Sequence, residues 1–132
     1  MRRRVSSARV GRLATVRTDG TPHLVPICFA VVGDTVVSGV DDKPKKTVEL
    51  QRLANVRANP AVSLLVDHYD EEWSRVWWVR VDGRARVVEG GPERDAAVTA
   101  LRAKYEQYER VAIGGAALVI DADRWSGWAY SA

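Results

Sequence analysis

The sequence predicts a mainly antiparallel β-barrel or sheet with six or more strands, two flanking helices and a single domain over residues 1–132. Three observations lead to this prediction. Strand-like segments joined by short turns dominate the chain, and a helical period occurs in only two places. The order of strands, helix, strands, helix and strand does not build βαβ units throughout. The sequence also lacks a Rossmann glycine fingerprint and a P-loop, which argues against a nucleotide-dependent α/β enzyme.

The first three strands are expected in the N-terminal third of the chain. Residues 6–32 read as two strands around TDGT (18–21), whose Asp-Gly pair suits a type I′ hairpin. The second of these strands, residues 23–32, is almost continuously apolar, as is typical of a strand buried on both faces. Pro26 within it indicates an edge position or a bulge. GDTVVSGV (33–40) predicts a third strand.

Two segments have a helical period. In TVELQRLANVRANP (47–60), Thr47 is a plausible N-cap, and Pro60 ends the helix. One face of this helix is predicted to carry Leu50, Leu53 and Ala54. The second helix is expected in residues 91–108, with Pro92 at its first position. Its apolar side is predicted to carry Val98, Leu101, Tyr105 and Tyr108.

Three further strands complete the prediction. AVSLLVDHY (61–69) is the fourth, and residues 73–89 are long enough for a fifth that continues through a bulge at Gly83. AALVIDADRWSGWAY (116–130) supplies the sixth. Hairpin connections between most of these strands favour a closed or strongly curved antiparallel sheet.

Composition favours a cytoplasmic protein without a membrane span. A lone Cys28 allows no internal disulfide, which is typical of a reducing compartment. No apolar run approaches the ~18 residues of a membrane span, and no apolar segment follows the basic start. The net charge of +3 permits an anionic ligand, but no aromatic-and-basic stripe of the kind that binds nucleic acids occurs. A nucleic-acid-binding barrel is therefore the least favoured interpretation.

Few side chains suit catalysis by the protein itself. His23 and His68 lack the spacing of a metal site, and Cys28 falls in a predicted core strand. The four carboxylates of DHYDEEW (67–73) fit a solvated turn better than an acid–base pair, because nothing nearby would desolvate them. If the protein is an enzyme, a bound cofactor supplies the reactive atoms.

A lysine-rich loop is the clearest candidate binding feature. Lys43, Lys45 and Lys46 come immediately before the expected helix start at Thr47. The free N–H groups of a first helical turn favour an anion, and the added ammonium groups suit a phosphate. A solvated run of charges would look the same, so both interpretations stay open on local grounds.

Four blocks in order carry a resemblance to a known superfamily. RVGRLATVRTDGTPHLVPICFAV (9–31), the lysine loop with its helix, NPAVSLLVDHY (59–69) and WVRVDGRARVV (78–88) are similar to the flavin/deazaflavin oxidoreductases with a split β-barrel. This superfamily is pyridoxamine 5′-phosphate oxidase-like, and the similarity covers about residues 5–130. The blocks VDHYD, WWVRVDGRARV and DRWSGW most resemble its actinobacterial branch, which is presumed to use the deazaflavin F420.

The resemblance implies a split β-barrel homodimer with the cofactor held at the subunit interface. The implied cofactor-binding positions are His23, Val25, Pro26, Ile27, Lys43, Lys45, Lys46, Thr47, Trp77, Trp78 and Arg80. The lysines would hold the cofactor's phosphate, and Lys43 or Arg52 would meet an acidic tail. Core and interface packing is an alternative role for the tryptophans. Unlike many flavin mononucleotide-binding relatives, this loop has no arginine beside its lysines.

The expected activity follows from the same resemblance. Reduced F420 would deliver a hydride to a small organic substrate, with Tyr69, Tyr130 or a water as a candidate proton donor. Two alternatives stay open: an oxidoreductase that depends on flavin mononucleotide, and a carrier that binds F420 or a flavin without turnover.

Overall fold

The computed structural model describes the backbone of residues 1–40 and 46–130, and the side chains of these residues apart from 46–50. Seven strands form one sheet, and three α-helices and two short 3-10 turns lie around it. The elements are α1 Arg2–Ser7, β1 Gly11–Val16, β2 Pro22–Ile27, β3 Ala30–Val32, β4 Thr35–Gly39, α2 Lys46–Ala58, β5 Ala61–His68, η1 Trp73–Arg75, β6 Trp77–Val88, α3 Pro92–Lys104, η2 Glu106–Glu109 and β7 Ala117–Ala129.

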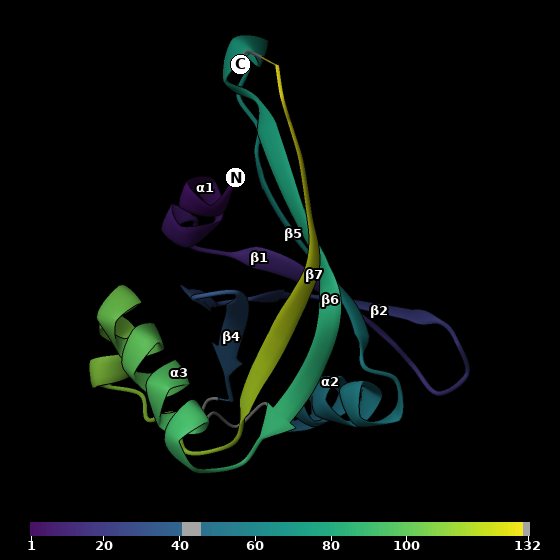
Figure 1. The fold of residues 1–132 in the computed structure, drawn as a ribbon, viewed down its shortest axis with the longest axis vertical. Helices are drawn as coiled ribbons and strands as arrows, with labels where there is room; N and C mark the ends of the chain where they lie inside the picture. The colour runs from purple at the N-terminus through teal and green to yellow at the C-terminus, as the bar shows by residue number, and fades with distance from the viewer. Residues whose placement is uncertain (41–45, 131–132) are drawn as a thin grey trace.

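The sheet is antiparallel throughout and strongly curved. Its strand order is β2-β1-β5-β6-β7-β4-β3, and β6 and β7 are the longest strands (Figure 1). β5, β6 and β7 extend together beyond the body of the molecule, while the β1–β2 hairpin projects to one side (Figure 1). The mainly β fold with flanking helices that the sequence predicts is confirmed.

The curved sheet separates two hydrophobic clusters. On its inner face, alternate residues of the central strands are buried, and α1 adds Val5 to them. The largest side chains of this inner cluster are Phe29, Leu13, Leu64, Leu118 and Ile120. On the outer face, α3 and η2 pack over β3, β4 and β7. All four residues predicted for the apolar side of the second helix are buried in this outer cluster, although the helix itself ends at Lys104.

Among the described residues, no helix covers the rest of the outer face. Leu13 on β1 pairs with Leu64 on β5, and both are fully buried in the inner cluster, so their strand neighbours point outward. Leu24 on β2 and Leu65 on β5 accordingly lie on the outer face, with 66% and 38% of their surface exposed. The apolar part of the outer surface over β2, β1 and β5 therefore consists of Leu24 and Leu65, and the exposed ion pair of Arg12 and Asp67 lies beside Leu65.

The first hairpin forms, but its turn differs from the prediction. Only Gly20 has a positive φ (87°), whereas a type I′ turn needs positive φ at both central residues. The N–H of Gly20 donates to the carbonyl of Arg17, and the N–H of Arg17 donates to the carbonyl of Thr21, which closes a longer loop. Asp19 Oδ1 accepts hydrogen bonds from both the backbone N–H and the hydroxyl of Thr21. This carboxylate stabilises the longer turn.

The predicted strand over residues 23–32 is wrong as one element. It is broken at Cys28 and Phe29 into β2 and β3, because the chain turns there from one edge of the sheet to the other. Cys28 is exposed and not in the core, whereas Phe29 is fully buried. β2 is an edge strand whose residues alternate in burial, so the edge position inferred from Pro26 is confirmed and burial on both faces is not.

The buried face of the first predicted helix differs in part from the one expected. α2 begins at Lys46, so Thr47 lies inside the helix instead of capping it. Leu53 is buried as predicted, but Ala54 is exposed. Arg52 and Asn55 are buried instead, with 7% and 1% of their surface exposed. Two polar residues on the buried face indicate a role beyond packing.

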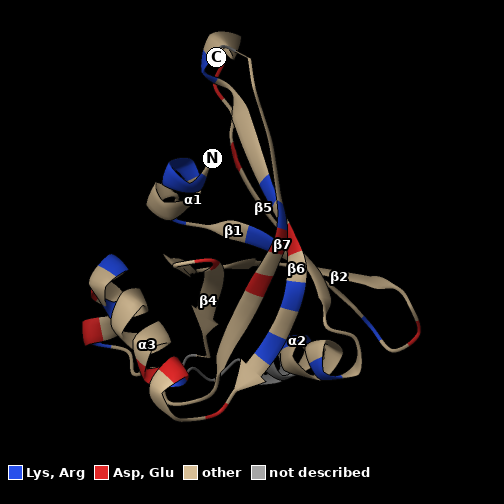
Figure 2. Cartoon of the chain, in the orientation of Figure 1, with Lys and Arg blue, Asp and Glu red and all other residues tan. Residues whose placement is uncertain are grey.

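The register between β6 and β7 shifts between Asp82 and Gly83, at the position where the sequence predicts a bulge. The extra residue, Asp123, lies on β7 and not on the predicted fifth strand. A Cβ on Gly83 would collide with the carbonyl oxygen of Asp121 on β7, so the close approach of the two strands requires glycine. Opposite charges face each other across this pair, as Figure 2 shows where basic residues of β6 lie beside acidic residues of β7.

Candidate functional site

A pocket of about 160 Å³ lies where the end of β2 meets β4 and α2. We call it the β2–α2 pocket. It is lined by Pro26, Ile27, Cys28, Ser38, Gly39, Arg52 and Tyr108. Two of the predicted cofactor-binding residues, Pro26 and Ile27, are therefore in its wall. Gly39 lies two residues before the lysine-containing segment 41–45, which is outside the described residues.

Arg52 supplies the positive charge of this pocket. It comes from the second turn of α2, and only 7% of its surface is exposed. Nearby His23 on β2 has a lowered pKa, first because of burial and then because of the charges of Arg17 and Arg52. Among the described residues, His23 Nδ1 is a buried nitrogen without a hydrogen-bond partner. A guanidinium in such a partly enclosed site is suited to an anionic group.

Hydrogen bonds hold α2, and with it Arg52, against the barrel. Asn55 Nδ2 donates to Thr15 Oγ1 on β1 at 3.0 Å, and both side chains are almost fully buried. Gln51 Nε2 in turn donates to Asn55 Oδ1 at 2.8 Å. Because Arg52 is one turn before Asn55, this buried pair fixes the face of the helix that enters the pocket.

The structure describes only some of the other cofactor-binding residues predicted on β2 and around the start of α2. Val25 is half-buried against the inner cluster, and Ile27 belongs to it. Lys43 and Lys45 lie outside the described residues. Lys46 and Thr47 belong to the first turn of α2 by their backbone, and their side chains lie outside the description. The phosphate role of the lysines therefore stays a prediction.

Sequence reasoning gave Arg52 only a secondary role and did not place Ser38 or Tyr108 at a site. One signal was available for Arg52, since Arg52, Asn55 and Val56 follow the i, i+3, i+4 spacing of one helical face. For Ser38, whose hydroxyl donates to the carbonyl of Cys28 at 2.9 Å, the chain offered no such signal.

A second, larger pocket of about 320 Å³ lies at the far end of the β5–β6 hairpin. We call it the tryptophan pocket. It is lined by Leu65, Asp67, His68, Tyr69, Val76, Trp77, Trp78 and Arg80. The predicted residues Trp77, Trp78 and Arg80 thus share one cavity. The predicted candidate proton donor Tyr69 lies beside them, whereas Tyr130 lines an adjacent, smaller pocket with Trp73 and Trp128.

The aromatic rings of the tryptophan pocket are held by cations and by each other. His68 stacks on Trp77 with ring centroids 6.3 Å apart and an interplanar angle of 24°. The guanidinium of Arg4 on α1 lies 5.3 Å from the Trp77 ring centroid, and that of Arg80 lies 5.8 Å from Trp78. Trp77 also packs against the inner cluster, so packing explains part of its position.

The two pockets are separate cavities within one chain. β1 and β5 lie between β2 and β6 in the sheet, so the strands that carry the two sets of residues are about 14 Å apart at ~4.8 Å per strand. Within the described part of one chain, the predicted cofactor-binding residues of β2 and those of β6 are therefore not in a single cavity.

The carboxylates of the predicted turn, possible metal ligands and possible membrane-spanning helices were also compared with the structure. The carboxylates of Asp67, Glu71 and Glu72 are exposed, as expected for a solvated turn, and Asp70 is half-buried. Within the described residues, no group of three His, Cys, Asp or Glu side chains could hold a metal ion. No helix in this part of the chain has the length and apolar character to cross a membrane.

Comparison with known protein families identifies this arrangement. A family model described as pyridoxamine 5′-phosphate oxidase matches residues 1–129. The chain belongs to this family. The expected resemblance to the flavin/deazaflavin superfamily and the split β-barrel fold are thereby confirmed. The search found no match among curated proteins.

Solved structures with a similar fold include proteins that share 25% or more of their sequence with this pyridoxamine 5′-phosphate oxidase family member. A conserved hypothetical protein from Mycobacterium tuberculosis is 25% identical, with a TM-score of 0.78 over 97% of this chain and 81% of that one. An F420 reductase is 26% identical, with a TM-score of 0.69 over 94% of each chain. A FAD-binding protein from Mesorhizobium loti is 28% identical, with a TM-score of 0.67 over 95% of this chain and 87% of that one.

Proposed function

We propose that this protein is an oxidoreductase that binds a flavin-type cofactor, with the deazaflavin F420 as the first candidate. The observation that carries the proposal is the buried Arg52 in the β2–α2 pocket, in a chain similar along most of its length to an F420 reductase. The family and the FAD-binding relative support the wider class of flavin-type cofactors.

The β2–α2 pocket fits the phosphoryl end of such a cofactor and not its ring. A volume of about 160 Å³ suits a small anionic group, whereas a tricyclic ring needs more space. The planar guanidinium of Arg52 can bind phosphate oxygens in a bidentate manner. The first turn of α2, which begins at Lys46, adds N–H groups that favour an anion. In this proposal Lys43, Lys45 and Lys46 complete the phosphate site.

A homodimer would supply the rest of the cofactor site. The apolar outer surface with Leu24 and Leu65 is available for a second copy, and a two-fold interface is the commonest arrangement of soluble oligomers. Such an interface would bring the β2–α2 pocket of one protomer toward Trp77, Trp78 and Arg80 of its partner. These residues would then face the cofactor ring and exclude water from it.

The chain's own residues bind, orient and desolvate in this proposal. When bound in its reduced form, the cofactor supplies a hydride for a small organic substrate. His23 and Val25 would line the path between the phosphate site and the ring. Two alternatives use the same pockets: flavin mononucleotide as the cofactor, or a carrier that holds F420 or a flavin without turnover.

A cofactor titration with one matched pair of variants tests the proposal. Cofactor-free protein is titrated separately with F420 and with flavin mononucleotide, followed by fluorescence. We expect F420 to bind more tightly. Arg52→Gln should weaken binding about 10- to 100-fold, the effect of losing a hydrogen bond to a charged group. Arg57→Gln is the control, because Arg57 lies on the same helix but is exposed and paired with Glu89.

Each outcome has a defined meaning. Preference for flavin mononucleotide would favour the flavin alternative, and binding of neither cofactor would overturn the proposal. Unchanged affinity in Arg52→Gln would remove the phosphate role of the β2–α2 pocket.

Three further measurements complete the test. A thermal unfolding scan of each variant identifies any loss of binding that comes from unfolding. The double variant Lys45→Ala with Lys46→Ala tests the lysines separately. Turnover of reduced cofactor with a panel of organic acceptors separates an enzyme from a carrier.

A further inference from the structure

The tryptophan pocket has the composition of a binding site for a flat organic molecule. One part of its wall consists of apolar surface from Leu65, Val76, Trp77 and Trp78. Polar groups from His68 and Tyr69 occupy another part of the same wall. Its volume of about 320 Å³ lies within the range of small-molecule sites, and large aromatic faces favour planar ligands.

His68 is held in a defined position at this pocket. Its ring stacks on Trp77, and its Nε2 atom lies 3.7 Å from Asp70 Oδ2. About half of the His68 side chain is exposed, so the ring is accessible from solvent as well as fixed. A fixed imidazole in a mainly apolar pocket can orient a ligand through one polar contact.

The two charged residues that line the pocket, Asp67 and Arg80, already have partners of opposite charge. Arg80 Nε donates to Asp82 Oδ2 at 3.0 Å, and Asp67 lies 3.8 Å from Arg12. Outside this lining, Asp70 faces His68, and the guanidinium of Arg4 lies over the ring of Trp77. A charged ligand in the pocket would meet lining charges that already have partners and would lose its hydration against the apolar part of the wall. This disfavours a charged ligand relative to an uncharged one.

We propose that the tryptophan pocket is the substrate site and takes an uncharged, planar, carbonyl-bearing ring compound. The ring of the compound packs against the tryptophans, and its carbonyl oxygen accepts a hydrogen bond at the polar wall, where His68 determines the specificity. The role as substrate rests on the proposed function, because the reacting cofactor ring has to lie beside the substrate. The binding itself does not depend on a cofactor.

An isosteric pair of probes tests both the shape and the charge of the ligand. Cofactor-free protein is titrated by calorimetry with naphthalene-1-carboxamide and with naphthalene-1-carboxylate. We expect the uncharged amide to bind at least threefold more tightly than the carboxylate. His68→Phe keeps a ring for stacking on Trp77 but removes the N–H group, and it should weaken amide binding about 3- to 10-fold, the effect of one neutral hydrogen bond.

A second variant separates this inference from the proposed cofactor site. Arg52→Gln should leave binding of the amide unchanged, because Arg52 lines the other pocket. Absence of saturable amide binding would overturn the inference. Tighter binding of the carboxylate, or an unchanged amide affinity in His68→Phe, would do the same. Loss of F420 binding with retained amide binding would count against the proposed function alone.

Discussion

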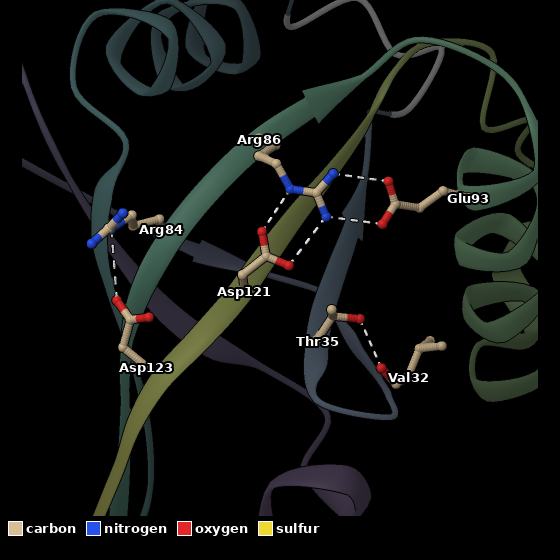
Figure 3. A network of polar contacts seen from close by, with 7 residues as sticks. All are labelled: Val32, Thr35, Arg84, Arg86, Glu93, Asp121 and Asp123. Carbon is tan, nitrogen blue, oxygen red and sulfur yellow. Dashed lines mark hydrogen bonds and ion pairs between the residues drawn. The ribbon is translucent and has the colours of Figure 1, made fainter.

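Arg86 on β6 and Glu93 in the first turn of α3 bind each other through two parallel hydrogen bonds of 2.9 Å (Figure 3). The same guanidinium donates two more hydrogen bonds to Asp121 on β7, of 2.6 and 3.1 Å. One arginine therefore connects the two longest strands of the sheet to the start of the helix that covers the outer cluster. Its hydrogen bonds and charge lower the pKa of the Glu93 carboxyl.

Arg86→Gln should lower the melting temperature at pH 7, and the difference from the wild type should shrink in acid. The pKa of Glu93 is below its ordinary value of 4.5 in the folded state, so the stabilisation is present above that value. It is lost as the pH falls through the folded-state pKa. Thermal scans at pH 7 and pH 3 measure both effects. Arg84→Gln is the control, since Arg84 makes one looser contact of 3.9 Å with Asp123 (Figure 3). An equal effect of the two variants would contradict the special role of Arg86.

Gly83→Ala should destabilise the protein by ~3 kcal/mol or more, because the added Cβ would overlap the backbone of Asp121 on the neighbouring strand. A backbone atom in the middle of the sheet has little freedom to move away. Gly90→Ala is the matched control, since no atom lies within 4 Å of the position of its new Cβ. Urea denaturation measures the free energy of unfolding of both variants. If Gly83→Ala unfolds at the wild-type urea concentration, the close approach of β6 and β7 is not required.

Lys104→Met should stabilise the protein at pH 7. Burial, and then the charge of Arg9, lower the pKa of Lys104 to about 8, while Cys28 acts in the opposite direction. Between about pH 8 and the ordinary value of 10.5 the unfolded chain binds more protons, so the stability of the wild type rises with pH there. The advantage of methionine should accordingly shrink as the pH rises through this window.

Denaturation curves at pH 7 and pH 10 for the wild type and Lys104→Met measure this difference, and other titrating groups cancel in the comparison. Lys104 Nζ lies 4.0 Å from the centroid of the Phe29 ring, a contact that favours the charged form. A destabilised Lys104→Met would show that this contact outweighs the cost of burial. Arg102→Met in the same last turn of α3 is exposed and should change stability little.

Leu24→Glu should shift the protein from dimer to monomer if the apolar outer surface is the proposed interface between copies. Leu24 is 66% exposed in a single chain, so a charge there costs the monomer little but would be buried at the interface. Sedimentation velocity over a range of concentrations measures the mass. Ala103→Glu, at an exposed position of α3, is the control and should leave the mass unchanged. A wild-type protein that sediments as a monomer would refute the dimer.

The elements that the sequence predicted well are those with a strong local pattern. The long strand that runs through Gly83 and the second helix beginning at Pro92 both form where alternation or helical period indicated them. The break at Cys28 was missed because the flanking residues are all apolar, and an apolar run does not show where a chain changes its position in a sheet. The turn type was wrong because Asp19 bonds to Thr21 instead of taking a positive φ.

The sequence predicted several residues of the candidate site, but not how they are arranged in space. The resemblance indicated the residues on β2 and on β6, but the separation of these strands depends on the strand order, which is a property of the whole sheet. The burial of Arg52 was missed because charged residues are usually exposed, so a buried guanidinium is visible only once its helix is packed.

The prolines of β2 disfavour edge-to-edge pairing of strands between copies of this chain. β2 is one edge of the sheet, and Pro22 and Pro26 lack the N–H groups that an added strand would need. The opposite edge, β3, is only three residues long. Both edges are thus poor templates for β-augmentation, which disfavours fibril-like growth by strand addition at each end of the sheet.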